Sequence, residues 1–235
     1  MKINLGCSSF YNAKWKGVFY PETMAGKDWF AFYCEHFGTF EINATFYKMP
    51  TLRVMKNWYD RSPDAFLYSV KAPKSVTHVK RFEDCKQDID AFYEVCRDGL
   101  REKLSCVLFQ FPPSFSYSEE RLQNILQNLD YGFNNVVEFR HASWWREDVQ
   151  KLLSDKNVIF CSVSHPNLPS EIISQNGSFY LRLHGVPKMF YSEYPETYLK
   201  ELADATKNRN GFVYFNNTAD TGGILNALRF KELSQ

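Results

Sequence analysis

The sequence carries almost no net charge, with 28 Lys and Arg against 27 Asp and Glu among 235 residues. This near-equal number of positive and negative residues argues against the broad basic surface with which a non-specific binder contacts nucleic acid or an anionic membrane. We therefore expect no membrane partner, and we do not favour nucleic acid as a partner. Any recognition of an anion must come from a local group of cationic side chains.

The sequence also lacks paired cysteines and long apolar runs. Its six cysteines are scattered and form no CxxC pair, which argues against a zinc ribbon or a disulfide framework and favours reduced thiols. No segment has the length and apolarity of a signal peptide or a membrane span. These absences predict a soluble, cytoplasmic protein.

Linkers and repeats are missing as well. No Gly/Ser-rich stretch divides the chain, and no internal repeat is evident, while 44% of the residues are hydrophobic and can fill a large core. We expect one globular domain over residues 1–235.

Eight short apolar runs, each bounded by turn residues, predict β-strands. They are INLGC from Ile3, TFEIN from Thr39, FLYSVK from Phe66, SCVLFQ from Ser105, VVEFR from Val136, VIFCSV from Val158, FYLRLH from Phe179 and FVYFNN from Phe212. Between most of them, apolar residues recur at helical spacing, most clearly from Cys85 to Leu100 and from Leu122 to Leu129. Strands that alternate with helices favour a parallel eight-stranded (β/α)₈ barrel of the TIM type over an open doubly wound sheet.

Polar residues gather on one face of these strands, near their carboxyl ends. In VVEFR, Glu138 and Arg140 alternate with the apolar Val137 and Phe139, so the two kinds of residue point to opposite faces. In a barrel the polar set would meet at one mouth, where such folds hold their active sites. This ring would contain Glu41, Asn43, Lys71, Gln110, Glu138, Arg140, Arg182, His184 and Asn216. The alternative is a purely structural network of buried ion pairs and hydrogen bonds.

Several motifs together resemble the domain of unknown function 72 family, also called YecE-like proteins. The motifs are GCSSFYNAKWKGVFYP, EINATFYKMP, VKAPKSVTHVKRF, FQFPPSF, EFRHASWW, YLRLHG and YFNNTADTGGILNA. The resemblance runs in order over nearly the whole chain and implies a TIM-barrel fold and a cytosolic protein, but no reaction. The chain departs from the family at Ser164, where members often carry an aspartate, which puts any role of that carboxylate in question here.

Four residues of the polar ring are candidates for catalysis: Glu41, Glu138, His184 and Lys71. Two carboxylates can divide acid and base roles, as they do in glycoside hydrolysis, if Glu41 and Glu138 approach one another. Alternatively each neutralises a neighbour, for example Glu138 with Lys71 or Arg182. Among the histidines, His184 at a strand end is the strongest candidate for proton exchange and His78 is the weakest.

Other residues are candidates for holding the substrate. Lys71, Arg140, Arg182 and His184 offer cationic donors to a phosphate or carboxylate. We add to these Asn43, Asn216 and Asn217 for orientation, Tyr47 and Trp15 for stacking, His78 and His141 in adjoining loops, and the Gly222–Gly223 pair at a helix start that can receive an anion. The aromatic rings can instead pack loops onto the fold, and the glycine pair can belong to an ordinary Thr-capped helix.

The sequence thus predicts an enzyme, a hydrolase or isomerase, that performs acid/base chemistry on a small phosphorylated or polyhydroxylated ligand. The first alternative is a binding module for a nucleotide, sugar phosphate or nucleic-acid end, without turnover. The second, by analogy of fold alone, is a metal-dependent phosphodiesterase. No HExxH or comparable spacing is present, so we expect no metal and no cofactor, and rank a divalent metal on Glu41, Glu138 and His184 lower. The substrate and the oligomeric state are not predicted.

Overall fold

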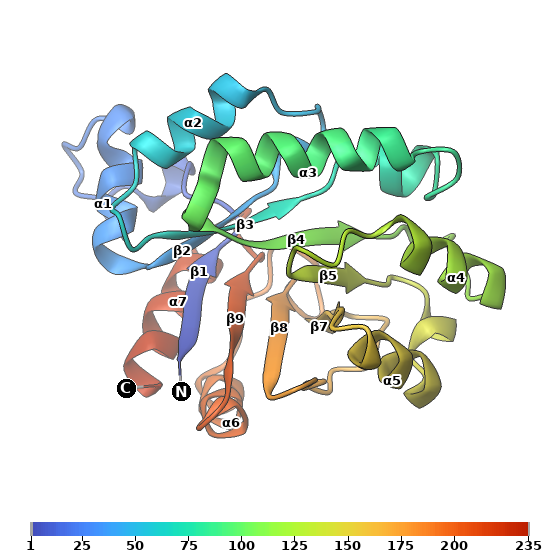
Figure 1. Cartoon of the computed structure of the whole chain (residues 1–235). Coiled ribbons are helices and arrows are strands. Elements are labelled where there is room, and N and C mark those ends of the chain that lie inside the picture. Colours follow the sequence, from blue (N-terminus) through green and yellow to red (C-terminus); the bar gives the residue numbers. More distant parts are fainter. Residues whose placement is uncertain (1, 235) are drawn as a thin grey trace. The chain divides into compact units, whose positions relative to one another are not determined.

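The computed structural model describes residues 2–234 and shows an α/β protein with two compact units (Figure 1). One unit consists of residues 1–41 and 162–235, and the other consists of residues 42–161. Each unit is built around parallel strands, as expected for strands that alternate with helices. We refer to them below as the terminal unit and the central unit.

The terminal unit contains a four-stranded parallel sheet in the order β1-β9-β8-β7. Its strands are β1 (Ile3–Cys7), β7 (Ser162–Ser164), β8 (Ser178–Leu183) and β9 (Asn210–Phe215). Its helices are η1 (Ala13–Trp15), η2 (Gly26–Asp28), α1 (Trp29–His36), α6 (Glu196–Thr206) and α7 (Gly222–Leu233).

The central unit contains a parallel sheet in the order β2-β3-β4-β5-β6, whose first strand, β2 (Thr39–Ile42), leads into this unit from the terminal one. The other strands are β3 (Leu67–Lys71), β4 (Leu104–Gln110), β5 (Asn135–Glu138) and β6 (Ile159–Phe160). Its helices are η3 (Ala44–Phe46), α2 (Leu52–Asp60), the π-helix η4 (Ser75–Val79), α3 (Lys86–Leu100), η5 (Arg101–Lys103), α4 (Glu119–Asn128), η6 (Ala142–Trp144) and α5 (Glu147–Asp155).

The prediction of a single closed eight-stranded barrel is wrong. The described residues form nine strands that hydrogen-bond into two separate parallel sheets. The division falls inside the predicted sixth strand, which is interrupted at Cys161: β6 pairs with β5, whereas β7 pairs with β8. A run of apolar letters cannot reveal such a break, because both halves are buried. The single domain over residues 1–235 stays a prediction.

The other predictions of secondary structure are largely confirmed. The seven remaining strands begin within two residues of their predicted starts, and α3 and α4 occupy the two helical patterns named from the sequence. Ser118 caps α4, with its side chain accepting a hydrogen bond from the Arg121 N–H. Within residues 2–234, no helix is long and apolar enough to cross a membrane.

An aromatic stack fixes the chain that follows β4 and β5 in the central unit. The ring of Trp144 lies between Phe139, at 4.0 Å, and Phe115, at 5.5 Å, with interplanar angles of 5° and 6°. Its indole N–H donates to the Phe115 carbonyl at 2.7 Å. Trp144 is fully buried. The stack therefore holds the segment with Arg140 against the loop after β4, and so positions polar groups at these strand ends.

We expect Trp144→Ala to lower the free energy of unfolding by about 3–5 kcal/mol, because it leaves a large cavity and removes two ring contacts. Urea unfolding followed by circular dichroism measures the loss. Trp145→Ala is the matched control, since that neighbouring ring is only partly buried. A loss for Trp144→Ala no larger than that of the control would contradict the role given to the stack.

Candidate functional site

Three polar side chains stand side by side at the carboxyl ends of neighbouring strands in the central unit. Lys71 ends β3, Gln110 ends β4 and Glu138 ends β5, and Gln110 and Glu138 are direct register partners. The Lys71 ammonium donates to Gln110 Oε1 at 2.8 Å. The Gln110 amide nitrogen donates in turn to the Phe111 carbonyl at 2.7 Å, which fixes the orientation of its oxygen. This row is the part of the predicted polar ring that the central unit assembles.

Glu138 is completely buried and is paired with Arg140, whose Nε donates to Glu138 Oε1. The thiol of Cys161 lies 3.8 Å from the other carboxylate oxygen. A buried carboxylate is tolerated when an adjacent cation and hydrogen bonds compensate it. The sequence alternative, in which Glu138 neutralises a neighbour, named Lys71 and Arg182 as examples, and the structure pairs Glu138 with Arg140. Glu138 thereby orients the Arg140 guanidinium at the end of β5.

His78 lies in the π-helix η4, a few residues beyond β3, and is half-buried. Its pKa is lowered from 6.5 to about 4, first by burial and then by nearby positive charge. The cations responsible are Lys71, Arg140, Lys74 and Arg81. His78 is therefore neutral at pH 7 inside a positive field, and π-helical turns are frequent at functional sites.

Phe46 connects His78 to Lys71. Its ring lies 4.9 Å from the His78 ring in an edge-on arrangement, and the Lys71 ammonium lies 4.1 Å from its centroid. The predicted residues Asn43 and Tyr47 flank it: Asn43 immediately precedes η3, and Tyr47 follows η3 with 80% of its surface exposed. His141 is explained locally, because its Nδ1 accepts from the Ser143 N–H and caps η6.

We call Lys71, Lys74, His78, Arg81 and Arg140 the cationic cluster. Sequence reasoning missed three things about it: the positions of Lys74 and Arg81, the contact with Phe46, and the prominence of His78. A signal is present in VKAPKSVTHVKRF, where three Lys and one Arg fall within eleven residues that begin at a strand end. The stretch has no regular helical period, so its pattern does not predict which of these side chains lie together.

The terminal unit holds its own buried ion pair. Arg182, at the end of β8, donates to Glu41 through Nε at 3.1 and 3.0 Å and through Nη2 at 2.7 Å. The Tyr180 hydroxyl donates to Glu41 Oε2 at 2.6 Å. Glu41 is 0% and Arg182 1% exposed, so water does not reach the pair. This geometry agrees with the structural alternative, in which Glu41 neutralises a neighbouring cation. The catalytic role of Glu41 stays a prediction.

A second polar chain in the terminal unit joins Ser8, Asn216 and His184. The Ser8 hydroxyl donates to Asn216 Oδ1 at 2.5 Å, and Asn216 Nδ2 lies 2.8 Å from His184 Nδ1. Because the amide nitrogen can only donate, Nδ1 is the acceptor in this contact. His184 is completely buried. Ser164 ends β7 and is buried as well, and the nearby Tyr194 hydroxyl accepts a hydrogen bond from the Gly185 N–H at 2.8 Å.

The other predicted site residues of the terminal unit lie in closely packed surroundings. Trp15 is fully buried, and its indole N–H donates to the Asp220 carbonyl at 3.0 Å. Asn217 is also buried, and its Nδ2 donates to the Ser192 carbonyl at 2.9 Å. A Cβ on Gly222 would lie 3.1 Å from Glu193 Cβ, and one on Gly223 would lie 2.7 Å from the Asn217 carbonyl oxygen. Close packing thus gives a structural reason for the glycine pair, and its role in binding an anion stays a prediction.

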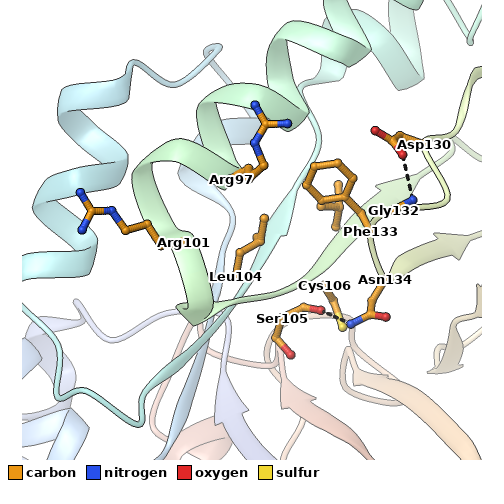
Figure 2. A pocket seen from close by; sticks show the side chains of 10 residues that line it. Arg97, Arg101, Leu104, Ser105, Cys106, Asp130, Gly132, Phe133 and Asn134 are labelled. Atoms are coloured by element: carbon orange, nitrogen blue, oxygen red, sulfur yellow. Dashed lines mark hydrogen bonds between the residues drawn. The ribbon is translucent and has the colours of Figure 1, made fainter.

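A cavity of about 370 Å³ opens at the other end of the central sheet (Figure 2). It is lined by the first residues of β4, by Arg97 and Arg101 near the end of α3, and by Phe133 before β5. The two arginines lie where cations stabilise the carboxyl end of a helix dipole. None of the residues predicted from sequence lines this cavity, which lies at the amino ends of β4 and β5.

A metal site needs several His, Cys, Asp or Glu side chains close together. Among the described residues, no group of three or more His, Cys, Asp or Glu side chains is arranged to hold a metal ion. The expectation of a metal-free site stays a prediction.

Comparisons with known proteins identify the family. The profile described as "Protein of unknown function DUF72" matches residues 4–235. The chain belongs to the DUF72 family. The predicted resemblance is therefore confirmed, although the family description names no reaction.

Relatives of this DUF72 chain include a curated protein and solved structures. UPF0759 protein YunF of Bacillus subtilis (strain 168) is 32% identical over 134 residues, 54% of this chain and 47% of YunF. The match thus spans about half of that relative's length. A DUF72 family protein from Thermotoga maritima MSB8 matches 99% of both chains with a TM-score of 0.89 and 28% identity. One from Enterococcus faecalis V583 covers 99% of this chain and 95% of that chain with a TM-score of 0.81, and at 18% identity shows a likeness of fold alone.

The buried ion pair of the DUF72 chain yields a stability prediction. Glu41→Gln keeps the side-chain shape but leaves the Arg182 charge uncompensated, so we expect a loss of about 3–5 kcal/mol in the free energy of unfolding. The double variant Glu41→Leu/Arg182→Met removes both charges and should lose less than the two single variants together. Urea unfolding measures each value. Full stability of Glu41→Gln would show that the pair is not a structural requirement.

His78 yields a prediction of pH dependence. Because its folded pKa of about 4 lies below its ordinary value of 6.5, the unfolded chain takes up the proton first as the pH falls. The contribution of this residue to stability is therefore present above pH 6.5 and is lost as the pH falls to about 4. We expect His78→Gln to gain stability relative to the parent chain over that interval. A constant difference between the two proteins in urea unfolding from pH 7 to pH 4 would contradict the assignment.

Proposed function

We propose that the central unit binds a small phosphorylated or carboxylated ligand at the cationic cluster, and that the protein is an enzyme that performs acid/base chemistry on it. The observation that carries this proposal is the convergence of four cationic side chains on one neutral histidine at the carboxyl ends of parallel strands. Ligands of open α/β sheets bind beyond these ends of the strands.

The surroundings of the cluster favour an anion. Lys71 donates to the Gln110 amide oxygen and lies against the Phe46 ring, and these contacts fix the position of its ammonium. Arg140 is oriented by Glu138 through Nε, and a planar guanidinium suits a phosphate or carboxylate. Burial and then the nearby cations keep the imidazole unprotonated, and an anion placed among these groups would reduce the second of these effects.

His78 is the best candidate for the proton transfer. The Thr77 hydroxyl donates to the Pro73 carbonyl at 3.4 Å and lies 2.9 Å from His78 Nδ1. The proposal requires the tautomer in which Nδ1–H of His78 donates to Thr77 Oγ1 and the Thr77 hydroxyl donates to Pro73, because this tautomer leaves the lone pair of Nε2 for a ligand proton. A bound anion would raise the pKa of this base toward neutrality, where a proton acceptor works best.

The other candidates take supporting roles in this proposal. Lys71 and Arg140 bind the anion, and Glu138 positions Arg140. Glu41 and Arg182 stabilise the terminal unit as a buried pair. The proton taken by His78 Nε2 comes from the ligand or from an attacking water and returns to the product, so an isomerisation or a hydrolysis balances without a redox cofactor.

Binding is tested first, with inorganic phosphate as the probe. We expect phosphate to raise the pKa of His78 from about 4 by at least one unit in an NMR titration of the histidine ring. Lys71→Met should weaken phosphate binding about tenfold or more, because a charge-assisted contact is lost. Lys151→Met is the control, since that lysine pairs with Asp155 at the surface. Unchanged His78 resonances at millimolar phosphate would refute the anion site.

Turnover is tested next, with a panel of small phosphorylated and carboxylated compounds. For a compound that is converted, His78→Gln should abolish kcat while KM changes little, whereas Lys71→Met should mainly raise KM. Saturable binding without conversion by the parent chain would favour the binding module instead. Unchanged turnover by His78→Gln would exclude this histidine as the base.

A further inference from the structure

We infer that the ligand of the cationic cluster is a phosphate monoester that carries an aromatic ring, with Tyr47 as the surface on which that ring stacks. A nucleoside monophosphate is the commonest biological compound of this class. The inference rests on the proposed function, because the same cluster must hold the phosphate.

Tyr47 is the most exposed large hydrophobic side chain in the described chain, with 80% of its surface open. An exposed phenol ring offers a large flat face to a ligand, with its hydroxyl still in water. The Tyr47 ring lies 5.3 Å from the Phe46 ring at 86°. Phe46 in turn contacts both His78 and Lys71. The exposed ring is thus one aromatic contact away from the proposed base and the proposed anion-binding ammonium.

The backbone under Tyr47 is fixed to the same strand end as the cluster. The hydroxyl of buried Thr45 donates to the Lys71 carbonyl at 2.6 Å, and the Tyr47 N–H donates to the Ala44 carbonyl at 3.2 Å. The short helix η3 therefore fixes the backbone of Tyr47 relative to the end of β3. A tyrosine side chain has only two rotatable side-chain angles, so ordering it against a ligand costs little entropy.

The chemistry of the ligand follows from these two neighbouring surfaces. The cations bind a phosphate, and the exposed phenol face binds a flat ring joined to it. Stacking on an aromatic side chain is favourable for every nucleobase, because each base has a π-face. An aromatic ring covers Tyr47 more completely than the puckered ring of a sugar does, which is why we favour the aromatic ester over a simple sugar phosphate.

Four probes separate these possibilities in isothermal titration with the full chain: inorganic phosphate, ribose 5-phosphate, phenyl phosphate and adenosine 5′-monophosphate. We expect the two aromatic esters to bind about tenfold more tightly than the other two. Tyr47→Ala should remove that advantage and leave the affinity for inorganic phosphate unchanged, while Tyr47→Phe should keep it. Tyr191→Ala, at another exposed tyrosine, is the control.

Each other outcome is decisive. Equal affinities for all four probes in the parent chain would overturn the inference and leave the anion site standing. Ribose 5-phosphate that binds as tightly as the aromatic esters and is weakened equally by Tyr47→Ala would replace the aromatic ring with a sugar. Failure of every probe to bind would remove both the inference and the proposed function.

Discussion

Buried charge is the constraint on which much of this structure depends. A carboxylate removed from water must be compensated by a nearby positive charge or by hydrogen bonds. In each unit an arginine at or just beyond the end of a strand pairs with the buried glutamate. In the terminal unit Glu41 is enclosed by Arg182 and the Tyr180 hydroxyl. In the central unit Glu138 is enclosed by Arg140 and the Cys161 thiol. Both pairs hold the ends of parallel strands and orient a guanidinium there.

The two pairs differ in what remains for chemistry. Arg182 donates to Glu41 through two of its nitrogens, and both oxygens of Glu41 are engaged. Arg140 meets Glu138 through Nε, with 8% of its side chain exposed, and is one of the four cations that lower the pKa of His78. The terminal pair is thus explained by stability, whereas the central one also contributes to a concentration of positive charge. A shared motif of Glu and Arg therefore supports two different roles, and only the surroundings distinguish them.

The sequence predicted which residues lie at the strand ends better than it predicted how the strands join. Alternation of apolar and polar residues is a local property, so Lys71, Gln110 and Glu138 were correctly grouped from their strands alone. The strands are instead divided between two sheets, with β6 ending and β7 beginning on either side of Cys161, and no letter of the sequence marks that break. His78 was undervalued for a related reason. Its importance arises from Lys71 and Arg140, which only the fold brings near it.

Positive charge around a neutral imidazole has a thermodynamic consequence for binding. The cations oppose protonation of His78, and an anion that reduces their field must favour it. Linkage makes the effect reciprocal: protonation of His78 strengthens binding of the anion by the same factor by which the anion strengthens protonation. Binding of an anionic ligand therefore raises the pKa of His78, the group that is to take the ligand's proton. The site thereby selects anions over neutral compounds. A neutral compound of the same shape would not raise the pKa of His78 and would leave it a weak base.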